Sequence, residues 1–470
     1  MIRFVDDFLN GITQYRLMLY FLICLLLIAT ALSAFGVLPF SPMALLFSAF
    51  FLTLVCWLSN TIFARVFKAQ TNLESVYITA LILVLIMTPL RTLQDALLLG
   101  LVAVLSQGSK YILAIGKKHI FNPAAFAVFL SAVTLNYSAS WWVGTSWMMP
   151  FVLAGGLLIA RKIRRFNMVV AFLIASLVLI LGSSLSRGID ALSIAQQIIL
   201  ETPILFFAFV MLTEPQTTPP GRIWRMVYGS LVGLLFVYFT PETALLAGNV
   251  FSYIISPKEK LLLTLKEKIQ IAPDIYDFVF GLSGKFNSQR EELVHFLPGQ
   301  YMEWTYAHKN PDSRGTRRYF TIAASPTEEN LRIGVKFYPD GSSFKKALIS
   351  LNPGDSIISS QLAGEFTLPK DSSKKLCFIA GGIGITPFRS MVKYLLDTNQ
   401  RKDIVLLFSN KLASDIVYEN IFDKAFQKLG NKTLNVLTDT ANVPKGWGGR
   451  VGFIDAKMIQ EEVPDYLDRT

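Results

Sequence analysis

Long apolar segments dominate the first 257 residues, and they constrain the fold more than any other feature of the chain. A membrane-spanning helix needs about 20 consecutive, mostly apolar residues. Ten segments approach or exceed this length: 15–38, 43–64, 74–90, 95–115, 121–136, 145–160, 166–184, 193–213, 223–240 and 242–257. We therefore expect residues 1–257 to form a polytopic α-helical membrane domain.

The remainder of the chain has a different composition. Residues 1–257 hold 15 Lys and Arg against 8 Asp and Glu, whereas residues 258–470 hold 29 and 25. The net charge of +11 thus divides into +7 and +4. Because the larger excess lies in loops between apolar segments, it indicates membrane topology and not nucleic-acid binding. We expect a membrane domain followed by a soluble part.

The basic residues fall on alternate loops. One side has only Arg91 and Arg187. The other side collects Arg3, Arg16, Arg65, Lys68, Lys110, Lys117, Lys118, Arg161, Lys162, Arg164, Arg165, Arg222, Arg225, Lys258 and Lys260. Since cytoplasmic loops are rich in Lys and Arg, both termini and the soluble part are predicted to be cytoplasmic, in a bacterial inner membrane. The apolar stretch from Tyr15 to Leu38 is too long for a cleavable signal peptide.

Two of the ten segments are short, the fifth (121–136) and the tenth (242–257), and each closes a group of five. Five spans per group would make the two halves inverted relative to each other. Short segments at matching positions indicate a buried site, although tilted helices without a ligand explain the same pattern. Glu201 is the acid that we expect well inside a span. It marks either an ion path or a carboxyl group near the outer interface beside Pro203.

Cysteine and histidine are too scarce for most metal centres. The chain has three of each: Cys24, Cys56, Cys377, His119, His295 and His308. Their spacing suggests no disulfide framework, zinc site or iron–sulfur cluster. A haem pair across the bilayer needs several axial ligands, and only His119 lies in the membrane half, so haem relays are excluded. We expect no metal.

Short motifs in the membrane half carry a resemblance. They are Lys110-Tyr111, His119 to Ala124, Met211 to Pro215, and Pro219-Pro220-Gly221. Residues 15–257 resemble the B subunit of the sodium-translocating NADH:quinone reductase and the D subunit of the Rnf complex, which have ten helices and carry flavins. Those subunits bind FMN covalently through a Ser-Gly-Ala-Thr motif, but this chain has no Gly-Ala dipeptide.

We therefore predict no covalent flavin in this chain. The resemblance leaves open a non-covalent flavin, FMN or riboflavin, near four polar residues of the membrane half. These are Lys110, Asn122, Thr213 and Asn249.

After Pro257 the apolar residues follow a period of two, which predicts short antiparallel strands. The strands are expected at 261–265, 276–280, 300–304, 317–322 and 331–337, and they suit a small β-barrel over residues 258–371. On a strand, side chains at i and i+2 share a face. Tyr319 and Thr321 would then point together at a flat redox ring, with Arg318 on its diphosphate. An ordinary barrel strand with a surface arginine is the alternative.

The turn Gly341-Ser342-Ser343 follows this strand and begins a short helix, whose N-terminus suits a diphosphate. Together with Arg318-Tyr319-Phe320-Thr321 it resembles the ferredoxin–NADP reductase superfamily, whose FAD signature is Arg-x-Tyr-Ser/Thr. The resemblance implies that Arg318, Tyr319, Phe320, Thr321, Gly341, Ser342 and Ser343 bind FAD. It also implies that Tyr319 and Thr321 lie at the reacting ring.

Strands and helices alternate from Lys374 onward, which predicts a parallel α/β domain over residues 372–470. The turn Gly381-Gly382-Ile383-Gly384-Ile385-Thr386-Pro387 lies between the first strand and the first helix, where dinucleotide phosphates dock. Behind a flavin barrel it resembles the NAD(P) site of the same superfamily. The resemblance implies contacts from Gly381, Gly382, Gly384, Thr386, Pro387 and Ser409.

In this resemblance Thr386 is a catalytic residue on the nicotinamide side, and Ser409 meets the adenosine ribose. Neither an acid nor an arginine follows Ser409, so the choice between NADH and NADPH stays open, with NADH favoured. The superfamily's final strand, with its Cys-Gly-Pro-like turn, would begin about where this sequence stops. We therefore expect a truncated sequence; the alternatives are that hydride transfer is impaired or that another chain completes the sheet.

Together these features predict a membrane-bound NAD(P)H-dependent flavin oxidoreductase. Electrons would pass from cytoplasmic NAD(P)H through FAD and a membrane flavin to an acceptor at the outer face, either a flavoprotein or a quinone. One alternative is a quinone or ferric reductase with ion translocation. Another is a transporter whose soluble domain senses NAD(P)H. Lipid is the other expected partner.

Overall fold

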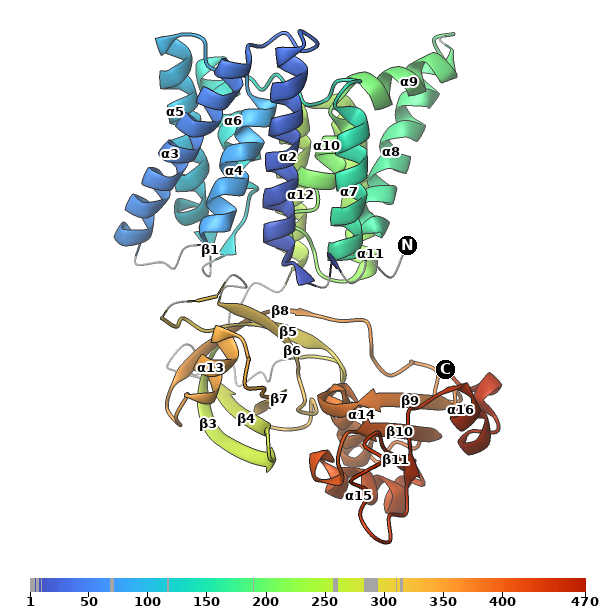
Figure 1. The fold of residues 1–470 in the computed structure, drawn as a ribbon. Coiled ribbons are helices and arrows are strands. Elements are labelled where there is room, and N and C mark those ends of the chain that lie inside the picture. Colours follow the sequence, from blue (N-terminus) through green and yellow to red (C-terminus); the bar gives the residue numbers. More distant parts are fainter. Residues whose placement is uncertain are drawn as a thin grey trace. The chain divides into compact units, whose positions relative to one another are not determined.

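The computed structural model describes residues 5, 8–9, 11–67, 72–115, 118–188, 190–256, 261–282, 295–309, 311–312 and 316–470. The chain divides into two compact units, Met1–Lys258 and Glu259–Thr470, coloured blue to green and yellow to red in Figure 1. The division falls beside Pro257, where the composition changes.

The first unit is helical. Its elements are α2 (Gln14–Ala34), α3 (Pro42–Val66), α4 (Leu73–Ile86), α5 (Leu93–Ile112), β1 (Ala114–Ile115), β2 (Lys118–His119), α6 (Pro123–Leu135), α7 (Met149–Ile163), α8 (Phe166–Leu185), α9 (Ala191–Glu201), α10 (Ile204–Phe206), the π-helix η1 (Phe207–Met211), α11 (Arg222–Tyr238) and α12 (Pro241–Ile255). Each of the ten predicted segments contains a helix.

Not all of these helices have the length of a membrane span. Among the described residues, α2, α3 and α8 are long and apolar enough to cross a bilayer, and the bent pair of α9 with α10 and η1 would add a fourth. The helix α4 has 14 residues and α6 has 13. The structure therefore supports a membrane-associated helical unit. The helix lengths by themselves do not establish ten membrane spans.

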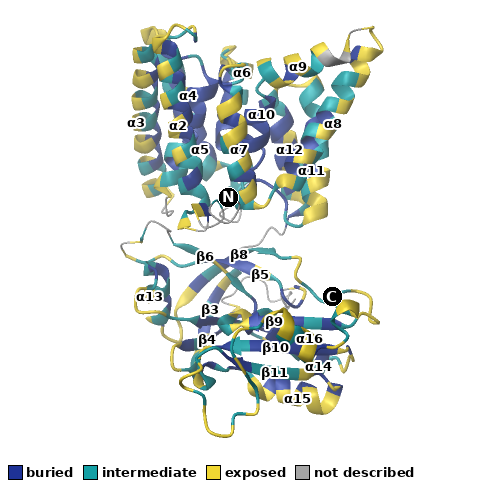
Figure 2. Ribbon diagram, turned by 45° about the vertical axis from the view of Figure 1, so that its right-hand side comes forward, coloured by how far each residue is buried: buried dark blue, intermediate teal, exposed yellow. Residues whose placement is uncertain are grey.

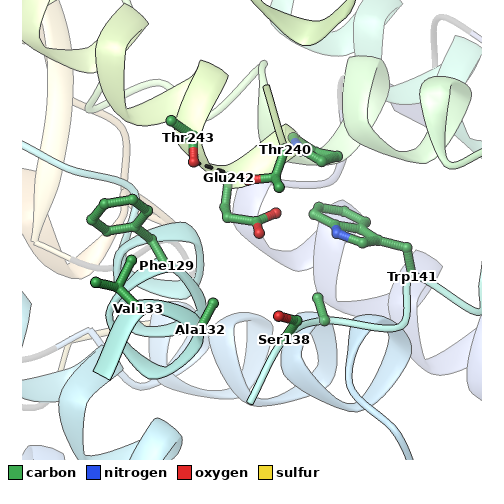
Figure 3. Close-up of a pocket in the computed structure, with 10 residues that line it drawn as sticks. Phe129, Ala132, Val133, Ser138, Trp141, Thr240, Glu242 and Thr243 are labelled. Carbon is green, nitrogen blue, oxygen red and sulfur yellow. Dashed lines mark hydrogen bonds between the residues drawn. The ribbon is translucent and has the colours of Figure 1, made fainter. Parts of the chain in front are cut away.

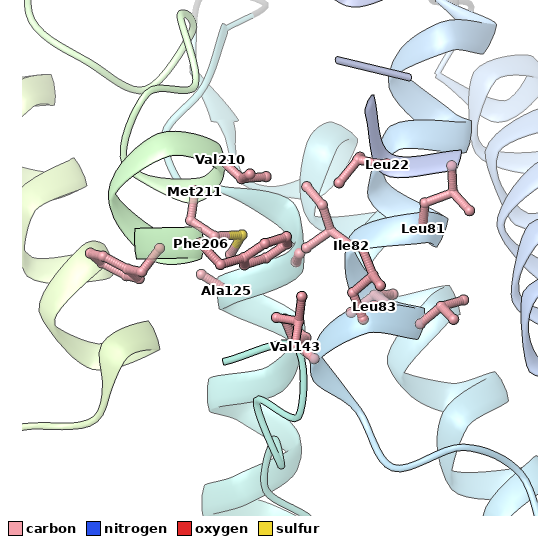
Figure 4. Close-up of a cluster of buried hydrophobic side chains, with 14 of the residues drawn as sticks. Leu22, Leu81, Ile82, Leu83, Ala125, Val143, Phe206, Val210 and Met211 are labelled. Atoms are coloured by element: carbon pink, nitrogen blue, oxygen red, sulfur yellow. The ribbon is translucent and has the colours of Figure 1, made fainter. Parts of the chain in front are cut away.

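The helices share one apolar core (Figure 4). Leu81, Ile82 and Leu83 of α4 lie in the same cluster as Ala125 of α6 and Phe206 of α10. From Thr79 to Ile86 every residue of α4 is buried, and seven of these eight residues are apolar. A helix segment that is buried on all sides belongs in the interior of a bundle. Its neighbours therefore shield α4 from lipid or water.

The eighth predicted segment is bent. Residues 193–213 do not form one continuous helix, because α9 ends at Glu201 and the chain bends by 62° before Ile204–Met211. Pro203 lacks the N–H that would continue the helix, so the bend falls where proline requires it. Glu201 thus ends α9 at the break, and its side chain is exposed.

The second unit begins with a six-stranded antiparallel barrel sheet. Its elements are β3 (Leu261–Ala272), β4 (Ile275–Leu282), β5 (Tyr301–Thr305), β6 (Arg317–Thr321), β7 (Leu331–Lys336), α13 (Ser343–Ile349) and β8 (Ser356–Ala363), in the strand order β6-β5-β8-β3-β4-β7. A hydrogen bond from the Ala323 N–H to the Arg332 carbonyl (2.7 Å) links the two edges. Trp304, Phe278, Phe280 and Phe344 fill the interior.

A parallel α/β domain follows the barrel. Its elements are β9 (Leu376–Gly381), η2 (Gly382–Ile385), α14 (Thr386–Asp397), β10 (Ile404–Asn410), η3 (Ala413–Asp415), α15 (Glu419–Leu429), β11 (Lys432–Leu437), β12 (Arg450–Val451), α16 (Ala456–Glu462) and η4 (Tyr466–Asp468), with the strand order β12-β11-β10-β9. The central strand β10 is almost wholly buried (Figure 2). At the far edge of β9, the Thr470 N–H donates to the Lys375 carbonyl (3.0 Å).

Buried charges join the barrel to the α/β domain. The Arg389 guanidinium on α14 binds both carboxylate oxygens of Glu328, at 2.6 and 3.0 Å, and donates to the Ala323 carbonyl at 2.7 Å. The Asp277 carboxylate on β4 accepts from Arg332 (2.7 Å) and from the Tyr418 hydroxyl (2.5 Å). Burial opposes ionisation of Glu328, but the bonds from Arg389 outweigh it and lower the pKa of this carboxyl.

We predict that Arg389→Gln lowers the melting temperature of the second unit by about 5–10 °C, because removing one partner of a buried pair costs about 3 kcal/mol or more. Lys393→Gln is the matched control, since Lys393 pairs with Asp397 on the outer side of the same helix. Such an exposed pair contributes under about 1 kcal/mol. Differential scanning calorimetry of the full chain in detergent measures both variants.

The effect of Arg389→Gln should depend on pH. Because the folded-state pKa of Glu328 lies below 4.5, its contribution to stability is fully present above pH 4.5 and is lost as the pH falls through the lowered value. Equal destabilisation by the two variants at pH 7 would contradict this account.

Candidate flavin and dinucleotide sites

The predicted flavin strand is β6, at one edge of the barrel sheet. It pairs with β5 in a register that sets Tyr319 opposite Glu303 and Thr321 opposite Tyr301. Alternation places Tyr319 and Thr321 on one face. The Tyr319 ring is half exposed, its hydroxyl donates to Glu303 Oε2 at 3.1 Å, and it meets the Tyr301 ring edge-on. Two aromatic rings and a hydroxyl thus share an accessible surface, which suits the stacking of a flat ring.

Arg318 lies on the opposite face, toward the helix α13. Its guanidinium stands over the Phe344 ring, 5.3 Å from the centroid, and 3.4 Å from the Asp312 carboxylate. The other Asp312 oxygen accepts from the Ser343 N–H at 2.9 Å. A carboxylate therefore occupies a position built by a guanidinium and a backbone N–H of the Gly341–Ser343 turn. These are the groups that bind a diphosphate.

Two residues in this arrangement were not predicted. His308 contacts Ser343 Oγ through Nε2 at 3.0 Å, and the Asp312 N–H donates to the same oxygen at 2.8 Å. Both lie in a polar stretch between strands that has no periodic pattern. A sequence signal for them would have been the two polar side chains, His308 and Asp312, just before the flavin motif.

The predicted dinucleotide turn lies at the carboxyl end of β9. Gly381 ends the strand, and the 3-10 turn Gly382–Ile385 leads directly into α14. Gly382 has φ +50°, which favours glycine, and open space surrounds the Cβ position of Gly381, Gly382 and Gly384. The backbone of this turn can therefore approach a phosphate closely. Ser409 aligns with Gly381 on the neighbouring strand β10.

Asn410 supplies the clearest sign of an external ligand. It is 4% exposed, and neither its amide nitrogen nor its amide oxygen has a hydrogen-bond partner among the described residues. A buried amide without partners costs about 1–3 kcal/mol. Since Asn410 ends β10 at the carboxyl edge of a parallel sheet, where dinucleotides bind, it fits a hydrogen bond to a bound nucleotide.

Thr386 is buried at the seam between the barrel and the α/β domain. Its hydroxyl donates to the Ile383 carbonyl at 3.2 Å, and its methyl group faces Gly334 of β7. A Cβ at Gly334 would lie 2.5 Å from the Tyr418 hydroxyl and 2.9 Å from the Thr386 methyl carbon. Burial of the Tyr418 side chain is the largest cause, and the negative charge of Asp277 the second, that raises the pKa of Tyr418 well above its usual value. This hydroxyl therefore stays protonated.

In the helical unit, the structure brings most of the predicted polar residues together. The Asn122 N–H donates to Asn249 Oδ1 at 2.8 Å, which ties the start of α6 to α12. Asn249 in turn donates to the Tyr228 hydroxyl at 3.1 Å. Lys110 Nζ donates to Thr79 Oγ1 at 3.0 Å, and Thr213 donates to the Phe209 carbonyl at 2.6 Å.

Asn122, Thr213 and Thr79 line one cavity between α2, α4 and α6. Its volume is about 70 Å³. Ligand pockets usually measure about 300–1,000 Å³, so the hydrogen-bonding groups suit a polar ligand but the space is smaller than a flavin ring needs. No three His, Cys, Asp or Glu side chains gather into a metal site in the described parts of the chain.

Comparison with known proteins identifies the second unit. Residues 262–367 match the oxidoreductase FAD-binding domain, and residues 378–470 match the oxidoreductase NAD-binding domain. The glycine betaine monooxygenase reductase subunit of Pseudomonas aeruginosa is 26% identical over 185 residues, which cover 39% of this chain and 50% of that protein. The chain thus spans about half the length of this relative.

Two further relatives share the same half of the chain. NADH-cytochrome b5 reductase 1 of Aspergillus clavatus is 28% identical over 254 residues, covering 51% of this chain and 80% of that protein. The cytochrome b5 reductase domain of Ulva prolifera nitrate reductase is 25% identical, with a TM-score of 0.37, and covers 44% of this chain and 82% of that structure. The two domain matches show that residues 262–470 form an FAD-dependent NAD(P)H oxidoreductase module.

We predict that Arg318→Ala raises the dissociation constant for FAD about 10- to 100-fold, because a hydrogen bond to a charged group contributes about 1.5–3 kcal/mol. Arg317→Ala removes the same charge from the neighbouring residue, which pairs with Glu303 instead, and should change FAD affinity little. Fluorescence titration of the FAD-depleted full chain measures both. Equal losses in the two variants would mean that only overall charge matters.

We also predict that Asn410→Leu raises the KM for NAD(P)H about 5- to 10-fold without lowering stability, because leucine removes an unpartnered buried amide. Asn431 provides the matched control. It is likewise 4% exposed with an unpartnered amide, but it lies at the opposite end of the sheet, before β11. Asn431→Leu should leave the KM unchanged. Ferricyanide reduction and calorimetry supply the two measurements, and an unchanged KM in Asn410→Leu would exclude the nucleotide contact.

Proposed function

We propose that the chain is a membrane-bound NAD(P)H oxidoreductase that passes electrons from its FAD module to an acceptor at the outer face of a bacterial cytoplasmic membrane. One observation carries the proposal. An FAD-binding domain, an NAD-binding domain and helices of membrane-spanning length belong to the same polypeptide. An NAD(P)H reductase that served only soluble partners would have no use for the helical unit.

The module's own residues supply binding and orientation. Bound FAD would supply two-electron acceptance from NAD(P)H and release of single electrons, which suits one-electron relays. Arg318 and the Ser343 N–H would hold its diphosphate, and Tyr319 and Thr321 would face its ring. Gly381 to Gly384 would admit the dinucleotide phosphates, and Thr386 would lie near the nicotinamide.

NADH is the proposed electron donor. The neighbourhood of Ser409 and Asn410 has Lys411 but no arginine to bind a 2′-phosphate in a bidentate manner. The names of the cytochrome b5 reductase relatives also specify NADH. Measuring kcat/KM for NADH and for NADPH tests this preference, because their ratio gives the selectivity of the chain between the two nucleotides.

For the helical unit we propose ten segments in two inverted halves, with both termini cytoplasmic. The alternation of basic loops supports this orientation. The hydrogen bond between Asn122 and Asn249 supports the pairing of the two short segments, since it joins the last segment of each half. The acceptor outside the membrane would be a flavoprotein or a quinone.

The proposed non-covalent FMN or riboflavin in the helical unit is the part that cofactor analysis must test. Lys110, Asn122, Thr213 and Asn249 offer hydrogen bonds, but the cavity beside them has a volume of about 70 Å³. Acid extraction followed by chromatography of the purified full chain measures which flavins are present. One FAD and one further flavin per chain is the expected result. FAD alone would remove the second flavin from the proposal.

We predict that the chain, reconstituted in liposomes with its module outside, reduces ferricyanide trapped inside when NADH is added outside. Arg318→Ala should lose this reduction in parallel with its loss of FAD. External ferricyanide, added to a second sample, measures the activity of the module alone. Reduction of external but not of trapped ferricyanide would show that the module works and that the helical unit does not carry electrons.

A further inference from the structure

A second pocket of the helical unit lies where α6 ends and α12 begins (Figure 3). Its volume is about 260 Å³, and it is lined by residues of α6, of the loop 138–141 and of the first turn of α12. The two aromatic walls are Phe129 and Trp141. The site lies wholly within the helical unit, so it does not depend on the proposed electron transfer.

Glu242 points its carboxylate into this pocket, between Phe129 and Trp141 (Figure 3). The side chain is 3% exposed, and its Oε2 atom has no hydrogen-bond partner in the described parts of the chain. A glutamate in the first turn of a helix is ordinary, because the helix dipole favours it there. Burial without a partner is not ordinary, since a buried carboxylate needs a compensating charge or hydrogen bond.

The loop that carries Trp141 is strained. Trp141 has φ +49°, a left-handed conformation that bulky residues rarely adopt. Hydrogen bonds of its backbone hold it there, from the Trp141 N–H to the Ile86 carbonyl (2.8 Å) and from the Gly144 N–H to the Trp141 carbonyl (2.9 Å). Such strain accumulates at ligand sites, where the surrounding structure fixes a side chain in place. Here it fixes the indole beside the Glu242 carboxylate.

The lining distinguishes an organic cation from a metal ion. Six of the ten lining residues are apolar, and the polar ones besides Glu242 are Ser138, Thr240 and Thr243. The Thr240 and Thr243 hydroxyls already bond each other at 2.9 Å. Alkali and alkaline-earth ions require oxygen ligands on most sides. A carboxylate between aromatic faces is instead the arrangement that attracts an ammonium group.

We propose that this pocket binds the ammonium group of a small organic cation or of a lipid head group, with Glu242 as counter-ion and Trp141 as aromatic wall. The two sources share one chemistry, a substituted ammonium. Its charge neutralises the buried carboxylate, and its alkyl groups contact Phe129 and Trp141.

Isothermal titration of the full chain in nanodiscs of phosphatidylglycerol tests the proposal, with choline as the probe. Choline should bind saturably, and its uncharged isostere 3,3-dimethylbutan-1-ol should bind at least 10-fold more weakly. Glu242→Gln should weaken choline binding at least 10-fold and Trp141→Phe less. Glu201→Gln should have no effect, because Glu201 is an exposed carboxylate of the same unit. Adding phosphatidylethanolamine to the nanodiscs should weaken choline binding if the lipid head group is the source.

Three results would overturn the proposal. One is equal binding of choline and its neutral isostere to the unmodified chain, which needs no variant to fold. Another is choline binding that survives in Glu242→Gln while its melting temperature is unchanged. The third is saturable binding of sodium ions in place of choline, which would make this an inorganic cation site.

Discussion

Two carboxylates, the buried Asp277 and the partly buried Glu328, hold the barrel and the α/β domain together as one compact unit. Asp277 is 1% exposed, and it is matched by Arg332 and by the hydroxyl of Tyr418 from the other domain. The Arg389 guanidinium donates a hydrogen bond to each carboxylate oxygen of Glu328. Because an unpaired buried charge is strongly unfavourable, neither domain can separate without exposing or leaving unpaired a charged group. Thr386 and the glycine turn keep their position relative to the barrel through this seam.

In the helical unit, buried polar groups are paired with neutral partners instead of charged ones. The Asn122 N–H at the start of α6 donates to the Asn249 side chain on α12, which in turn donates to the Tyr228 hydroxyl. Lys110 directs its ammonium group at hydroxyls and a carbonyl of α4. Such satisfied networks need only structural explanations. Glu242 differs because its buried Oε2 atom has no such partner among the described residues, although the side chain faces a pocket.

Much of the second unit could be predicted, because period-two strands and glycine turns leave strong local patterns. The strand β8 was missed because Ser356, Ser359 and Ser360 interrupt its apolar alternation, although it is central in the sheet. Asp277, Tyr418 and Arg389 were missed because their roles arise from contacts between residues far apart in the sequence. The bend after Glu201 could have been predicted from Pro203, which follows it by two residues. The burial of Glu242 depends on the loop 138–141, which lies about 100 residues earlier in the sequence. The residues around Glu242 therefore do not predict that it is buried.

The position of Asp312 has a consequence for how the module acquires its cofactor. Its carboxylate already bonds Arg318 and the Ser343 N–H, the groups that would receive an incoming diphosphate. A side chain tethered on the same polypeptide acts at a high effective concentration. If these groups bind the diphosphate, loading exchanges one anion for another, and Arg318 keeps an anionic partner both with and without the cofactor.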